Sequence, residues 1–121
     1  MIKISVCDDD EGQLTFFKQC FMEYNEKHKE KIEANFYQSV QSLLNEKKFS
    51  PDVYFLDIEL QDGNGLKLAG KIRTRNSKIP IVFITSHEEF MPEAFQVHAY
   101  QYLNEKKNAQ AVENVLNQLA D

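Results

Sequence analysis

Cysteine is scarce in this chain, with only Cys7 and Cys20 among 121 residues. The two do not form a Cys-x-x-Cys pair and provide no disulfide framework, which excludes a small disulfide-stabilised scaffold. Because free cysteine is one of the residue types most often buried, we expect both to be reduced residues packed in the interior. The histidines have no cysteine or acid at the spacing of a zinc site.

Long apolar runs are also missing. No stretch approaches the roughly 20 apolar residues that a helix needs to span a bilayer. The N-terminus has neither the basic region nor the small-residue cleavage site of a signal peptide. We therefore expect a cytoplasmic protein that does not contact a membrane.

Positive charge is in deficit, since 14 lysines and arginines stand against 19 aspartates and glutamates and the formal net charge is -5. A nucleic-acid-binding domain usually shows clustered basic residues, and no broad basic face is evident here. We expect no direct contact between this domain and nucleic acid.

Short apolar runs alternate along the whole chain with segments that have the apolar spacing of an amphipathic helix. The alternation predicts βαβ units and a parallel sheet in one α/β domain over residues 1–121. The third and fourth strands are apolar on both faces, which is typical of central parallel strands. The five predicted strands are residues 2–7, 32–37, 53–56, 79–84 and 100–103.

Helices are predicted in the connections between the strands and after the last one. Pro92 is tolerated in a first helical turn, so the fourth connection should hold a short helix that begins near Met91. The other four are indicated by apolar residues at helical spacing: Leu14, Phe17, Phe21 and Tyr24; Val40, Leu43 and Leu44; Leu66, Ala69 and Ile72; and Val112, Val115, Leu116 and Leu119.

Acidic residues follow two of the predicted strands. Asp8, Asp9 and Asp10 come directly after the first strand, and Asp57 comes directly after the third. If these strands are neighbours in a parallel sheet, their carboxyl ends open into one crevice, where open α/β sheets bind ligands. Two charges about 4 Å apart repel by roughly 4 kcal/mol at an effective dielectric of about 20, so the cluster calls for a cation. Oxygen ligands of this kind suit Mg²⁺ and leave room for phosphate oxygens, which predicts phosphoryl chemistry.

The chain resembles the receiver domain of two-component response regulators over essentially all of its length. The shared marks are an acidic pair after the first strand, an aspartate and a later glycine after the third, a hydroxyl residue that closes the fourth, and an aromatic residue in the fifth. In this sequence they are Asp8 and Asp9, Asp57 and Gly65, Thr85, and Tyr102. The resemblance implies a three-layer, doubly wound, five-stranded parallel sheet with the flavodoxin-like strand order 2-1-3-4-5.

The resemblance also implies a role for the acidic residues. Asp57 would accept a phosphoryl group from the phosphohistidine of a sensor histidine kinase. Mg²⁺ would be held by Asp9, Asp57 and the backbone carbonyl of Glu59, and by Asp8 through a metal-bound water. Transfer to a carboxylate depends on charge neutralisation and in-line positioning, so this role agrees with the chemistry expected from the acid cluster alone. The domain would be a phosphoacceptor and not an enzyme that turns over a substrate.

Thr85 and Tyr102 would transmit the change in such a domain. A phosphoryl group brings negative charge and strong acceptor oxygens, toward which the Thr85 hydroxyl would move. Tyr102 would then turn inward and reshape the face made by the fourth helix, the fifth strand and the fifth helix, through which a homodimer is also expected. An ordinary core position remains an alternative for Tyr102, because aromatic residues are common in strands.

The motifs at residues 6–10, 54–58 and 83–87 are most similar to those of regulators whose output is a LytTR-type DNA-binding domain. Such a domain would follow Asp121 in a longer regulator of transcription. The sequence leaves open whether the chain is a fragment or a stand-alone receiver.

One position departs from the family. A lysine is expected three residues after Tyr102, usually followed by proline, whereas this chain has Glu105 and then Lys106. Glu105 would add a fourth carboxylate near the pocket, and the phosphoryl group would lose the cation that binds it, so transfer should be weaker. Lys106 or Lys107 would replace the missing lysine only if the loop shifts. A non-proline cis peptide costs about 2.5 to 4 kcal/mol, so we expect a trans loop.

Two other functions are compatible with parts of the pattern. Glu105 favours a degenerate receiver that serves as a phosphorylation-independent interaction module. A small Mg²⁺-dependent phosphatase would use an Asp-x-Asp motif after the first strand, but it would need a helical cap insertion that the sequence does not contain. Asp10 is interpreted as the N-cap of the first helix, a position that aspartate favours.

Overall fold

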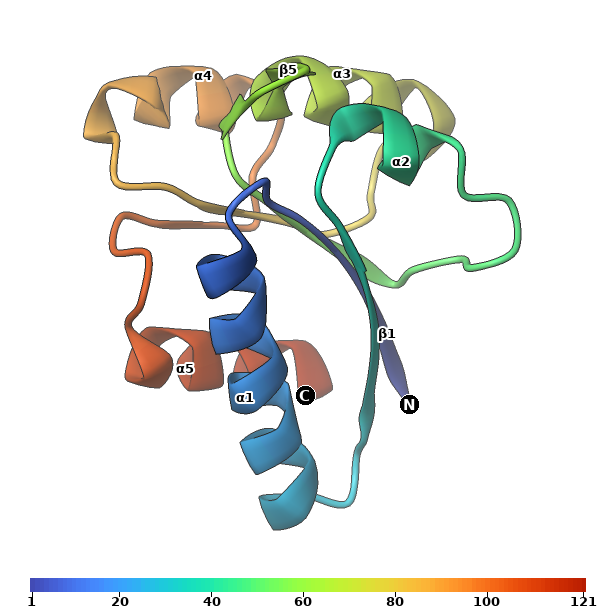
Figure 1. Ribbon diagram of the computed structural model, residues 1–121, viewed down its shortest axis with the longest axis vertical. Helices are drawn as coiled ribbons and strands as arrows, with labels where there is room; N and C mark the ends of the chain where they lie inside the picture. The colour runs from blue at the N-terminus through green and yellow to red at the C-terminus, as the bar shows by residue number, and fades with distance from the viewer.

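Five parallel strands form the central sheet of the structure, a computed structural model that describes residues 1–121 (Figure 1). The order across the sheet is β2-β1-β3-β6-β7, which confirms the predicted order of the five strands. The predicted ranges of the first three are correct, and those of the last two begin slightly too early. The strands are β1 (Ile2–Cys7), β2 (Ile32–Tyr37), β3 (Val53–Leu56), β6 (Ile81–Ile84) and β7 (Gln101–Leu103).

Helices cover both faces of this sheet, as the predicted three-layer fold requires. Two lie on one face and three on the other (Figure 1). The first pair is α1 (Glu11–Lys27) and α5 (Ala109–Ala120), and the second group is α2 (Val40–Leu44), α3 (Gly65–Arg75) and α4 (Met91–Gln96). A single 3-10 turn, η1 (Glu88–Phe90), leads into α4, and the predicted short helix beginning near Met91 is confirmed. None of the helices combines the length and apolar composition needed to cross a bilayer.

The two faces of the sheet bury separate apolar clusters. On the α1 and α5 side, Phe17 and Phe21 pack edge-on against Phe55 of β3, with ring centroids 5.8 Å apart in both pairs. On the other side, Phe83 of β6 and Leu68 of α3 are fully buried. The central strands are therefore apolar on both faces because each face has its own layer of helices to pack against.

Both cysteines are free thiols, in agreement with the sequence. Cys20 is half-buried against the α1 side of the core. Cys7 is completely buried at the end of β1, and its thiol contacts the Ser39 carbonyl oxygen at 3.5 Å. Burial, together with the charges of nearby aspartates, raises the pKa of Cys7 to about 12. The Cys7 thiol consequently stays protonated at neutral pH.

The strand order brings the two acidic segments together. β1 and β3 are hydrogen-bonded neighbours, and Cys7 lies opposite Leu56 at their carboxyl ends. The Asp57 N–H donates to the Cys7 carbonyl at 3.0 Å, so Asp8 and Asp57 leave the sheet side by side. After β3 the chain forms a small hairpin of two short antiparallel strands, β4 (Glu59–Leu60) and β5 (Gly63–Asn64).

Close approach of α3 to the end of β3 requires glycine at position 65. The Gly65 N–H donates to the Ile58 carbonyl at 2.7 Å. A Cβ at this position would lie only 2.0 Å from the carbonyl oxygen of Asp57. The contact is with backbone, so no rotamer change can relieve it. Gly65 thus permits the first turn of α3 to pack on the residue that ends β3.

Gly65→Ala should lower the free energy of unfolding by about 1 to 3 kcal/mol, the usual range for overpacking, because α3 or the backbone at Asp57 has to move. Gly70→Ala is the matched control within the same helix, since nothing lies within 4 Å of a Cβ at Gly70. Alanine at that position should stabilise the helix by about 0.5 to 1 kcal/mol. Urea denaturation measures both variants, and equal stabilities would contradict the packing argument.

Candidate functional site

Three carboxylates converge where β1 and β3 end. One oxygen from each of Asp8, Asp9 and Asp57 lies within 4.8 Å of the others. They line an open hollow of about 420 Å³ whose walls come from the loops at the carboxyl ends of β1, β3, β6 and β7. The other lining residues are Asp10, Glu59, Leu60, Gln61, Thr85, Ser86, His87 and Lys106. The predicted crevice is therefore present.

Each of the three carboxylates has a hydrogen-bond partner. Asp8, which is 1% exposed, accepts from the Asp10 N–H at 3.0 Å and from the Lys106 ammonium at 2.8 Å. Asp57 accepts from the Ile58 N–H at 2.7 Å, and its Oδ2 lies 3.0 Å from the Lys106 Nζ. Asp9 accepts from the Gln61 N–H at 2.9 Å, which joins the β1 loop to the loop after β3.

Lys106 supplies the cation of the site. Its ammonium lies against both Asp8 and Asp57. The Lys107 ammonium lies beside the first turn of α1 instead, 3.7 Å from the position that a Cβ at Gly12 would take. Glu105 is exposed and does not line the hollow. The expectation that Glu105 adds a fourth carboxylate near the pocket is therefore wrong. Of the two lysines that the sequence left open as replacements, Lys106 is the one beside Asp57. All peptide bonds of this loop are trans, as expected.

The charges of the cluster are only partly balanced. Burial raises the pKa of Asp8, even though the hydrogen bonds from Lys106 and from the Asp10 N–H lower it. Burial alone would lower the pKa of Lys106, but its hydrogen bond to Asp8 and the charge of Asp57 outweigh this effect and raise it. One ammonium is shared between two carboxylates, and Asp9 adds further negative charge. The hollow therefore favours an additional cation.

The donor set fits a hard divalent cation. Asp8, Asp9 and Asp57 offer only oxygen ligands, which is the type that Mg²⁺ prefers, and Glu59 lines the same hollow. Asp10 does not belong to this set, because its side chain accepts from the Gly12 N–H at 2.9 Å and caps α1. The interpretation of Asp10 as an N-cap is confirmed.

Thr85 and Tyr102 both contact the backbone of the residue that leads into α4. The Thr85 side chain, at the end of β6, is buried and its Oγ1 accepts from the His87 N–H at 3.3 Å. Tyr102 of β7 is half-buried opposite Phe83, and its hydroxyl donates to the His87 carbonyl. Thr85 lines the acid-lined hollow, whereas Tyr102 does not. The two residues are thus linked through one peptide segment.

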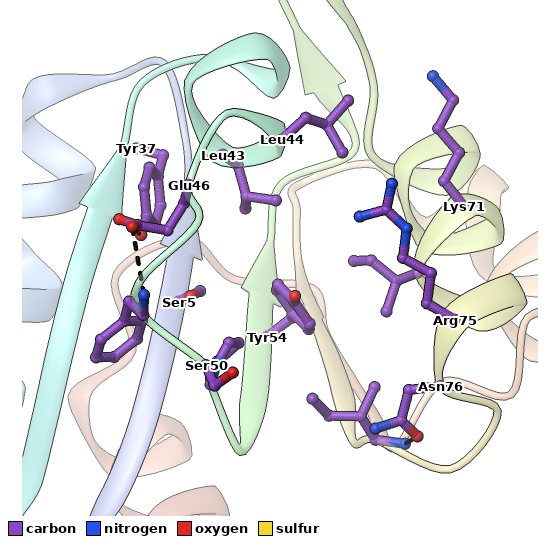
Figure 2. Close-up of a pocket in the computed structure, with 14 residues that line it drawn as sticks. Ser5, Tyr37, Leu43, Leu44, Glu46, Ser50, Tyr54, Lys71, Arg75 and Asn76 are labelled. Atoms are coloured by element: carbon purple, nitrogen blue, oxygen red, sulfur yellow. Dashed lines mark hydrogen bonds between the residues drawn. The ribbon is translucent and has the colours of Figure 1, made fainter.

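A second cavity, of about 220 Å³, lies between α2 and α3 (Figure 2). It shares no residue with the acid-lined hollow. Its one carboxylate, that of Glu46, already accepts from the Tyr37 hydroxyl at 2.9 Å. Lys71 and Arg75 stand at its α3 side without an acidic partner (Figure 2). This cavity holds no cluster of metal-binding side chains, whereas the acid-lined hollow holds the cluster of Asp8, Asp9 and Asp57.

The family model described as the response regulator receiver domain matches residues 4–117. The chain belongs to this family. It is 29% identical over 120 residues to an uncharacterized response regulatory protein of Yersinia pestis, an alignment that covers 99% of this chain and 49% of that protein. Over 56 residues it is 38% identical to the sensory transduction protein LytT of Bacillus anthracis, which covers 46% of the chain and 23% of LytT. This receiver domain is therefore similar to LytT-type and LytR-type regulators, as its motifs predict.

Solved structures show the same fold. The response regulator TrrA of Thermotoga maritima, solved with Mg(2+)-BeF, superposes with a TM-score of 0.83 at 21% identity and covers 98% of this chain and 99% of its own. The non-phosphorylated HemR receiver domain of Leptospira biflexa gives a TM-score of 0.81 at 20% identity and covers 98% of this chain and 93% of its own. The receiver domain spans about half the length of the Yersinia pestis relative.

Two residues near the site were not predicted from the sequence to belong to it. The His87 ring lies between two carboxylates, with Glu59 Oε2 at 3.3 Å and Glu89 Oε1 at 3.0 Å. Gln13 is buried in α1 and donates to the carbonyl of Lys106. His87 follows Thr85 and Ser86 at the end of β6, and this position could have marked it as a site residue. No local pattern in the sequence marks Gln13.

Asp8→Asn should stabilise this receiver domain at neutral pH when no divalent cation is present. Because burial raises the pKa of Asp8, its contribution to stability is full below the usual value of 3.8 and is lost as the pH rises through the folded-state pKa. Asparagine does not titrate, so the variant does not lose this contribution to stability as the pH rises. Urea unfolding in EDTA should therefore show a larger advantage of the variant at pH 7 than at pH 4, and a pH-independent difference would contradict this assignment.

Proposed function

We propose that this receiver domain accepts a phosphoryl group on Asp57 from a sensor histidine kinase, with Mg²⁺ in the acid-lined hollow, and that the modification switches a partner surface. One observation carries the proposal: Asp8, Asp9 and Asp57 converge at one edge of the sheet with the ammonium of Lys106 between two of them. A cluster of acids beside a single half-buried cation is the arrangement expected where charge must be neutralised during phosphoryl transfer.

The chemistry follows from how the two oxygens of Asp57 are held. Oδ1 accepts from the Ile58 N–H, which fixes the carboxylate, and Oδ2 lies beside the Lys106 Nζ. In the proposed step a carboxylate oxygen attacks phosphorus, the bond from phosphorus to the kinase histidine breaks, and the imidazole keeps the electron pair. Lys106 then neutralises the phosphoryl oxygens as a point charge. Bound Mg²⁺, held by Asp8, Asp9, Asp57 and the Glu59 carbonyl, would supply further charge neutralisation.

The proposed switch uses the link through His87. A phosphoryl group on Asp57 offers acceptor oxygens to the Thr85 hydroxyl, which now faces the His87 N–H. Movement of that segment alters the carbonyl to which Tyr102 donates. The face of α4, β7 and α5 would change with it, and Phe95 and Tyr100 are already 63% and 40% exposed there. We propose this face for the partner or for a homodimer.

We place a single receiver domain over residues 1–121 and propose that it works in the cytoplasm as a non-enzymatic signalling domain. The similarity to LytR and LytT supports an output domain of the LytTR type in a longer protein. That output domain, and not the receiver with its net charge of -5, would contact DNA. No helical cap of the kind that a phosphatase would need is inserted after β1, since α1 begins at Glu11 directly after the acids.

Asp57→Asn should abolish the mobility shift of the chain on a Phos-tag gel after incubation with acetyl phosphate and Mg²⁺. The amide cannot form the acyl phosphate, so no shifted band should remain. Asp52→Asn is the matched control, because the Asp52 side chain is exposed and does not line the hollow. Removal of Mg²⁺ with EDTA should also remove the shift of the wild type. A wild type that never shifts, with acetyl phosphate or with a kinase, would instead support a phosphorylation-independent interaction module.

Lys106→Met should slow phosphorylation of Asp57 by about 100-fold or more, the usual effect of removing one preorganised donor from a transition state. Lys107→Met should leave the rate nearly unchanged, because the Lys107 side chain is exposed and lies beside Gly12. Initial rates from Phos-tag gels compare the two variants. The assignment of Lys106 would be overturned if Lys107→Met were the slower of the two.

A further inference from the structure

Gln13 is a fully buried glutamine with a single side-chain partner. It lies in the first turns of α1 at 1% exposure, and its Nε2 donates to the backbone carbonyl of Lys106. Glutamine is mostly an exposed residue type, so complete burial calls for a compensating hydrogen bond. The carbonyl of Lys106 is the group that provides it.

The loop that carries Lys106 has few other attachments. It leaves β7 after Leu103 and ends at Asn108, whose side chain accepts from the Ala111 N–H at 3.0 Å and caps α5. Between these points the bond from Gln13 is the one hydrogen bond that the backbone of residues 104–107 receives. The Asn104 side chain makes an exposed contact with Glu88 at 2.8 Å. Gln13 is therefore the buried anchor of the loop.

This anchor decides which side chain enters the acid-lined hollow. Fixing the carbonyl of Lys106 fixes the start of its flexible stem, from which the ammonium reaches Asp8 and Asp57. The neighbours Glu105 and Lys107 are exposed in the same loop. A slip of one residue in either direction would turn Glu105 or Lys107 toward the carboxylates in place of Lys106.

We propose that Gln13 is a positioning residue that sets the register of the loop after β7 and so places Lys106, and not Glu105 or Lys107, against Asp57. The inference rests on the proposed function, because the rate of phosphorylation is one of its readouts. It goes further by assigning to α1 a part in building the phosphoryl site. It also explains how the chain supplies a cation although its lysine follows Tyr102 by four residues.

Gln13→Leu removes the donor and keeps a side chain of similar size, and it should slow phosphorylation of Asp57 by about tenfold, within what misplacement of a catalytic group produces. The full chain is used, with Gln19→Leu as the control because Gln19 is exposed on the same helix. In a Lys106→Met background Gln13→Leu should have no further effect. An equal slowing in both backgrounds would overturn the proposal, because a merely structural role does not depend on Lys106.

A second measurement does not depend on phosphorylation. Acetylation of lysines by an N-hydroxysuccinimide ester, quantified by peptide mass spectrometry, should show Lys106 protected relative to Lys107 in the wild type. Gln13→Leu should raise the ratio of Lys106 to Lys107 labelling several-fold, and Gln19→Leu should not change it. An unchanged ratio in Gln13→Leu would refute the positioning role even if the wild type is phosphorylated normally.

These readouts separate the two proposals. If the wild type is not phosphorylated on Asp57, the proposed function fails, while the labelling ratio still decides whether Gln13 holds Lys106. If circular dichroism shows that Gln13→Leu does not fold, Gln13→Met takes its place, since methionine matches glutamine in length and flexibility and has no donor.

Discussion

Repulsion among carboxylates at the ends of β1 and β3 is the constraint on which the rest of the structure depends. Parallel pairing of the two strands forces Asp8 and Asp57 to leave the sheet as neighbours, and Asp9 completes the cluster. The ammonium of Lys106 relieves part of the repulsion, and it does so from the far end of the chain. The cluster thus keeps uncompensated negative charge at one edge of the sheet, and a divalent cation would neutralise it.

Close packing also fixes the positions of the carboxylates in this cluster. Gly65 allows α3 to begin against the backbone of Asp57, and Asp9 holds the following loop through the Gln61 N–H. Backbone groups therefore fix the carboxylates more than side chains do. Such a frame would suit the phosphoryl transfer proposed above, which depends on position and charge and not on a general acid or base.

Apolar periodicity was sufficient to predict the strands and helices, because each follows from a local pattern. The strand order that brings the acids together was implied by the resemblance to receiver domains. The place of Lys106 was not predictable in this way. It depends on a hydrogen bond from Gln13, 93 residues away in the sequence, and no local pattern reports such a contact. His87 was missed for a related reason, since its position between Glu59 and Glu89 depends on two separate segments of the chain, the one after β3 and the one after β6.

Cys7 occupies the last position of β1, directly before the acids, and its pKa of about 12 keeps the sulfur protonated. Oxidants attack thiolates, so a buried and protonated thiol is chemically inert. A reactive sulfur at this point would tie the neighbouring aspartates to the redox state of the cell. Because the thiol is inert, the charge of the neighbouring acid cluster does not depend on oxidation of Cys7.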